Sequence, residues 1–117
     1  MVRVVSSAPK LRHVIALQRP VSVKDAVGGF SMAYDTLANP RAEITPLSTR
    51  DRFLAAQSQS EATHRITIRF DNRVVDMDGS WRILFGARTF MIEGFPRNLD
   101  ERNQWLEIIA IEGLRTE

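Results

Sequence analysis

Strict alternation of apolar and polar side chains between residues 62 and 70 is the feature that most constrains how this chain can fold. One set of alternate residues is Ala62, His64, Ile66, Ile68 and Phe70, and the intervening set is Thr63, Arg65, Thr67 and Arg69. A period of two residues is that of a β-strand, and a strand with one apolar face needs a second apolar surface on which to bury it. The sequence therefore predicts a half-buried strand within a larger sheet.

Extended segments precede this strand. Residues 11–17 alternate in the same way, and the strand is predicted to continue past Pro20 to Val23, with Pro20 marking an edge or a bulge. Residues 24–29 are predicted to form a turn, because adjacent glycines supply the positive φ angles of tight turns. A loop is then expected, followed by an extended stretch at residues 37–47.

The C-terminal half adds a hairpin and a last strand. Residues 81–85 and 88–92 flank Gly86 and Ala87, which predicts a β-hairpin, and residues 104–112 predict the final strand. Together the segments predict a mainly β fold, a small β-barrel or sandwich of about five to six strands with one short helical or loop insertion. The side chains predicted to be largely buried in its central strands are Ile66, Ile68, Ile83, Phe85, Ile109 and Ile111.

The insertion follows Pro46. Ser48 and Asp51 have the spacing of a helix capping box, and residues 52–57 contain good helix formers. The Ser-Gln-Ser stretch at residues 58–60 predicts a polar linker. A short helix and a mobile loop are both compatible with this segment.

Length and composition narrow the class of protein. The 117 residues correspond to one domain, with residues 1–10 and 114–117 predicted to be flexible arms. The absence of cysteine excludes disulfides and thiolate metal sites and fits a reducing cytoplasm, and no run is apolar enough to span a membrane. The net charge is only +2, and the basic residues other than Lys10 and Lys24 are all arginine, which is common in protein interfaces. A dedicated nucleic-acid binder carries a stronger and more clustered excess.

Candidate chemical groups are few. His13 and His64 lie in phase with apolar strand positions and lack a third ligand at metal-binding spacing, so they are interpreted as core or cross-strand histidines. Asp76 and Asp78 could bind a cation or exchange protons, but the Gly-Ser pair that follows favours a solvated turn. Neither a nucleophile elbow nor a phosphate-binding loop occurs. The sequence therefore predicts no catalytic residue, no metal site and no cofactor, and a protein that is not an enzyme.

The order of the segments carries more information than any one of them. Ala-Glu-Ile-Thr-Pro-Leu-Ser at residues 42–48 and Thr-His-Arg-Ile-Thr-Ile-Arg at residues 63–69 are the most specific, followed by the hairpin and the last strand. This succession resembles the head–tail joining family of long-tailed phages, also called head-closure or stopper proteins, over residues 11–113. One departure is Asn39-Pro40-Arg41, where the family often has an aromatic residue before the alanine that aligns with Ala42.

The resemblance implies a structural function in the neck of a phage-like particle, infectious or a gene transfer agent. A small β-barrel subunit would form a homo-oligomeric ring of six or twelve copies that closes the DNA channel. The implied partners are a portal adaptor protein above, a tail terminator or tail tube protein below, and packaged double-stranded DNA without sequence specificity. Assembly would take place in the bacterial cytoplasm, with no membrane involved.

The resemblance also implies where the channel is closed. The closing loop of the family corresponds to residues 45–60 of this chain. The residues assigned to closure are Thr45, Pro46, Leu47, Ser48, Thr49, Arg50, Asp51, Arg52, Phe53, Leu54 and Gln57.

A second class of function stays open at this point. Small β-barrels can bind single-stranded nucleic acid through stacked aromatic side chains and a basic groove. Against this, the strand aromatics Trp81, Phe85, Phe90 and Trp105 lie at mostly apolar positions, where core packing is the default.

Overall fold

The computed structural model describes residues 10–74 and 76–113, so the arms predicted at residues 1–10 and 114–117 lie, apart from Lys10, outside the described residues. The described residues form nine strands in one antiparallel sheet, with the order β1-β4-β5-β9-β7-β6-β2-β3 and with β8 paired to β9. The strands are β1 (His13–Val14), β2 (Ala16–Lys24), β3 (Phe30–Ala38), β4 (Arg41–Pro46), β5 (His64–Arg69), β6 (Arg82–Phe85), β7 (Arg88–Ile92), β8 (Arg97–Asn98) and β9 (Trp105–Glu112).

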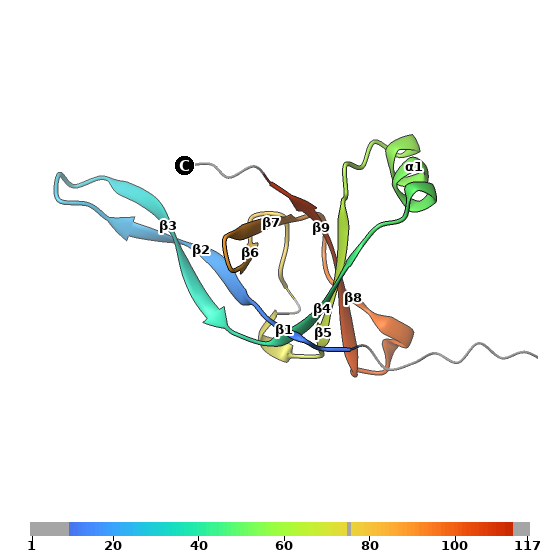
Figure 1. Cartoon of the computed structure of the whole chain (residues 1–117). Helices are drawn as coiled ribbons and strands as arrows, with labels where there is room; N and C mark the ends of the chain where they lie inside the picture. The colour runs from blue at the N-terminus through green and yellow to red at the C-terminus, as the bar shows by residue number, and fades with distance from the viewer. Residues whose placement is uncertain (1–9, 75, 114–117) are drawn as a thin grey trace, which may run out of the picture.

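The sheet curls because one continuous stretch of chain pairs with strands on opposite sides of the sheet. β1 and β2 are separated by Ile15 alone, yet β1 pairs with β4 and β2 pairs with β6. Figure 1 shows the resulting half-barrel. The prediction of a mainly β fold with one short helix is confirmed, and the curl favours a barrel over a sandwich. The strand count of nine is higher than the predicted five to six.

The largest missed element is β3, most of which was expected to be a loop. It pairs along its whole length with β2, and Pro20 faces Tyr34 in this pairing. The turn between the two strands is the predicted one, with Gly28 at φ +89° and the Asp25 amide donating to the Gly29 carbonyl at 2.9 Å. Because β2 pairs with β6 only from Ala16 to Gln18, the rest of the β2–β3 hairpin projects from the barrel as an arm (Figure 1).

The predicted strand at residues 62–70 is confirmed as β5, and the predicted hairpin as β6 and β7 around Gly86 at φ +59°. β5 lies between β4 and β9, so it is an interior strand of the curled sheet. The buried hydrophobic cluster inside the curl consists of Ile15, Leu17, Ala42, Ile66, Ile68, Val74, Met77, Ile83, Phe90, Ile92, Leu106, Ile108 and Ala110.

The predicted face of β9 is wrong. Ile109 and Ile111 were expected in the core, but they lie on the outer face and are half-buried, whereas Leu106, Ile108 and Ala110 point inward. Both faces of this strand are apolar, so alternation could not distinguish them. Phe85 is also only partly buried, against the core and 4.7 Å from the ring of His13.

No helix among the described residues is both long enough and apolar enough to cross a membrane.

Candidate functional site

The segment assigned to channel closure leaves the sheet at the end of β4 and returns at the start of β5 (Figure 1). Pro46 still pairs with His64, and the Leu47 amide donates to the Thr63 carbonyl at 2.9 Å. Thr45 and Pro46 therefore belong to the sheet, and the chain departs from it only after Leu47.

Helix α1 (Thr49–Gln57) begins at the predicted cap. Ser48 has an extended backbone, and its Oγ accepts a hydrogen bond from the Asp51 amide at 3.1 Å. This bond satisfies one of the donors that a helix N-terminus otherwise leaves unpaired. The Asp51 carboxylate lies 3.8 Å from Nη2 of Arg65 on β5, which ties the first turn to the barrel. Of the two alternatives that the sequence left open, the structure has the short helix.

The helix ends in a defined cap where the sequence predicted a polar linker. Gln59 takes the left-handed conformation at φ 65°, the Ser60 amide donates to the Ala55 carbonyl, and the Gln59 amide donates to the Ala56 carbonyl, both at 2.9 Å. These two bonds define a Schellman motif. The Ser60 hydroxyl then donates to the Glu93 carboxylate at 2.6 Å. Both ends of α1 are thus fixed to the barrel.

Between its two anchored ends, α1 packs only loosely against the barrel. None of its residues, all of which the structure describes, is buried, and Phe53 and Leu54 are 63% and 49% exposed. An open groove of about 500 Å³ separates one face of the helix from the chain that follows it. The groove is lined by Thr49, Arg52, Phe53 and Ala56 of the helix and by Ser60, Glu61 and Ala62. The remaining exposed positions Arg50, Leu54 and Gln57 lie outside this lining.

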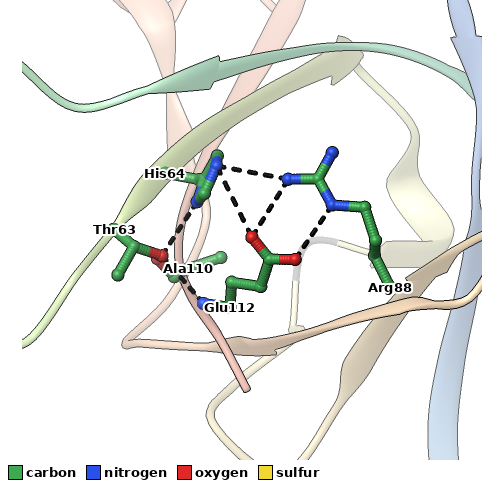
Figure 2. Close-up of polar contacts among 5 residues, drawn as sticks. All are labelled: Thr63, His64, Arg88, Ala110 and Glu112. Carbon is green, nitrogen blue, oxygen red and sulfur yellow. Dashed lines mark hydrogen bonds and ion pairs between the residues drawn. The ribbon is translucent and has the colours of Figure 1, made fainter. Parts of the chain in front are cut away.

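A polar cluster of Thr63, His64, Arg88 and Glu112 joins the start of β5 to β7 and β9 (Figure 2). Arg88 donates from Nε and Nη2 to the two carboxylate oxygens of Glu112, at 2.9 and 3.0 Å. The Thr63 hydroxyl oxygen accepts from the Glu112 amide at 2.8 Å and lies 2.8 Å from Nδ1 of His64. Thr63, His64 and Glu112 border a second hollow together with Pro46, Leu47 and Arg52. Arg52 therefore lines both the groove and this hollow.

The contacts of His64 select one neutral tautomer. Its Nε2 lies 3.4 Å from Nη2 of Arg88, which can only donate, so Nε2 accepts and Nδ1 carries the proton toward Thr63. Burial lowers the pKa of His64 below its ordinary 6.5, and the cations of Arg88 and Arg52 lower it further, against the opposing charge of Glu112. The hydrogen bonds from Arg88 in turn lower the pKa of Glu112.

These shifts predict a pH dependence of stability. Because the pKa of His64 is lower in the folded chain, the unfolded chain binds a proton more readily, and stability falls as the pH drops below about 6.5. The carboxylates with lowered pKa, Asp71, Asp78 and Glu112, titrate below 4.5 and stay ionised in this window. We expect the free energy of unfolding to fall between pH 7.5 and pH 5.5 in the natural chain. In H64N, whose amide can still donate to Thr63, urea unfolding should give a flatter profile, and equal slopes for the two proteins would contradict this assignment.

His13 and Asp78, two of the other candidate groups from the sequence, make contacts that support the fold. His13 packs against Phe85, and Asp78 accepts a hydrogen bond from the Ser80 amide at 2.8 Å, which is the solvated turn that the sequence predicted. Within the described residues no group of three or more His, Cys, Asp or Glu is arranged to hold a metal ion. The cluster around Glu112 was missed because its members are far apart in the sequence, and only the pairing of β9 with both β5 and β7 brings them together.

Comparison with solved structures finds proteins of the same fold. Protein SF1141 from Shigella flexneri 2a, known from its solution structure, superposes with a TM-score of 0.76 at 22% identity, over 95% of this chain and 100% of that one. A chain from the virion of a native gene transfer agent particle superposes with a TM-score of 0.60 at 20% identity, over 92% of this chain and 100% of that one. At these identities the likeness shows the fold. Comparison with curated proteins finds no match.

The family is shown by the sequence itself. The phage head completion protein family matches residues 6–113, which is nearly the whole chain and includes the barrel, the arm and α1. The resemblance stated from the order of the segments is thereby confirmed. This chain belongs to the phage head completion protein family and is a structural component of the head–tail region of a phage-like particle.

Proposed function

We propose that this protein forms a ring in the neck of the particle, between the portal adaptor and the tail, and that residues 45–60 close the DNA channel. The observation that carries the proposal is helix α1, which is fixed to the barrel at both ends while none of its residues is buried. A nine-residue helix is marginal in isolation and is normally stabilised by packing of an apolar face. We therefore expect α1 to be stabilised by packing against neighbouring molecules in the assembled neck.

The composition of α1 suits a position at the channel axis. Arg50 is exposed and carries a charge that attracts the phosphates of DNA regardless of base sequence. Leu54 is exposed on the same face of the helix and can contact the same residue of other copies. Ring symmetry would repeat this set of side chains around one axis, so that weak contacts of each copy add up in the assembly.

A single thiol tests whether α1 reaches the axis. The chain contains no cysteine, so L54C introduces a unique reactive site. We expect oxidation of assembled necks to yield disulfide-linked dimers of L54C, because copies of the helix converge at the axis. N72C carries its thiol at an exposed position on the 3-10 turn after β5 and serves as the control that stays uncrosslinked. Necks in which L54C behaves like N72C would place the helix away from the axis.

A further inference from the structure

The β2–β3 arm carries an apolar stripe on one of its faces. Directly paired residues of antiparallel strands lie on the same face, and alternate residues share it. Phe30, Met32 and Tyr34 therefore lie on one face together with Lys24, which pairs with Phe30. The side chains of Phe30, Met32 and Tyr34 are 70%, 67% and 37% exposed, respectively. The outer arm consequently presents aromatic and thioether side chains to solvent beside one ammonium group.

The base of the arm is held firmly. The guanidinium of Arg82 on β6 stacks on the ring of Tyr34 at 3.9 Å, and its Nε donates to Gln18 at 2.7 Å. Gln18 in turn donates to Thr36 across the hairpin at 2.9 Å. The arm is thus presented in a fixed direction from the barrel.

Such an arm requires a second surface. A two-stranded hairpin with both faces in water is at best marginally stable. The stripe exposes roughly 300–400 Å² of apolar side chain, which is comparable to the largest apolar patch of a typical monomer, and such patches are often functional. The arm is therefore expected to be covered in the assembled particle.

The surface that matches the stripe is the groove beside α1, at the other side of the molecule from the arm tip (Figure 1). The groove is concave and contains the exposed ring of Phe53 and the methyl groups of Ala56 and Ala62. Its lining also includes the carboxylate of Glu61. Within the described residues no ion pair involves Glu61 or Lys24. The apolar stripe therefore matches the apolar part of the groove, and Lys24 beside the stripe can pair with Glu61 in the groove, whose lining also includes the guanidinium of Arg52.

We propose that the stripe of one copy docks into the α1 groove of the next copy, with Lys24 against Glu61. The contact joins two different surfaces on opposite sides of the subunit, so each copy can bind the next in the same way. Such a chain of copies closes into a ring when a whole number of the rotations between neighbours makes 360°. The contact rests on the proposed ring and is distinct from the closure of the channel, because it concerns the face of α1 formed by Thr49, Arg52, Phe53 and Ala56. The face with Arg50, Leu54 and Gln57 stays free for the channel, so the contact and the closure can fail independently.

A charge exchange tests the contact. K24E and E61K each place like charges together in the docked pair, and we expect each to lower incorporation of the subunit into particles at least severalfold. The double variant K24E/E61K restores an opposite pair and should recover most of the incorporation. Both residues are exposed, so the melting temperatures of the three isolated variants should match that of the natural chain. A double variant that incorporates no better than the single variants would overturn the proposal.

Cysteine pairs test the geometry directly. Particles assembled from a mixture of M32C and A56C chains should give disulfide-linked dimers on oxidation, because these residues meet in the docked arm. S31C is the matched control, since Ser31 is the exposed neighbour of Met32 on the opposite face of the arm. Dimers formed by M32C alone would show that arms pair with arms, and disulfides of neither kind would show that another protein covers the stripe. Either outcome overturns the proposal.

Discussion

Replacing Ile68 by alanine is expected to lower the free energy of unfolding by about 2–5 kcal/mol, the range for truncated core residues. Ile68 is fully buried on β5 and lies between Ala42 on β4 and Leu106 on β9. The neighbouring strands are held by their own hydrogen-bonded registers and cannot close the cavity that the substitution would leave. The measurement is urea unfolding of the purified chain, followed by the change in midpoint at constant slope.

A matched substitution controls for the side-chain type. Ile109 on β9 is the same residue on the outer face of the same sheet, and it is only half-buried. I109A should cost about 1 kcal/mol or less, since less of its surface leaves water on folding. A larger effect for I109A than for I68A would mean that the inner and outer faces of the sheet are assigned in reverse.

The contrast between these two residues also explains which parts of the fold the sequence could predict. β5 alternates apolar and polar residues, so the inward face with Ile66 and Ile68 was predictable, whereas the burial of Thr67 on the other face was not. β9 is apolar on both faces, because Ile109 and Ile111 cover the outside of the barrel while Ile108 fills the inside. Its existence was predictable, but its face depends on the register with β5, which no local pattern encodes.

The β2–β3 arm and helix α1 also show that local sequence patterns predict some features and miss those that depend on the fold. The turn at Gly28 was predictable from the backbone freedom of glycine. β3 was missed although apolar side chains recur at every second position from residue 30 to residue 34, and this alternation was the signal that could have found it. The N-cap at Ser48 was predictable from local hydrogen bonding. The anchoring of Ser60 to Glu93 was not, since those residues meet only through the fold. The groove beside α1 likewise depends on how the chain returns to the barrel after the Schellman motif.

The second large effect is expected from the channel face of α1. Substitution of Arg50, Leu54 and Gln57 by alanine should leave the ring intact but let filled heads lose their DNA before tails attach. The three side chains are exposed, so their loss should cost little stability, and alanine maintains the helix. Removing them takes away the charge that holds phosphate and the apolar contact between copies at the axis. Deletion of the whole helix would be less informative, because it would also remove the groove in which the neighbouring arm is proposed to dock.

Two comparisons separate channel closure from ring assembly. The R102A/Q104A variant changes exposed residues elsewhere on the surface and should retain DNA like the natural chain. K24E should fail earlier, with fewer rings on the heads. Loss of DNA from heads with complete rings would therefore point to the channel face, whereas loss from heads without rings would point to the docking face.

The most direct measurement is the fraction of tail-free heads that keep their DNA against added nuclease, compared between the natural ring and the R50A/L54A/Q57A ring. Ring occupancy would be determined on the same particles by mass. Channel closure by residues 45–60 predicts nuclease-resistant DNA in heads with natural rings and nuclease-sensitive or empty heads with fully occupied variant rings. Equal protection of DNA by the two rings at equal occupancy would contradict closure by this segment.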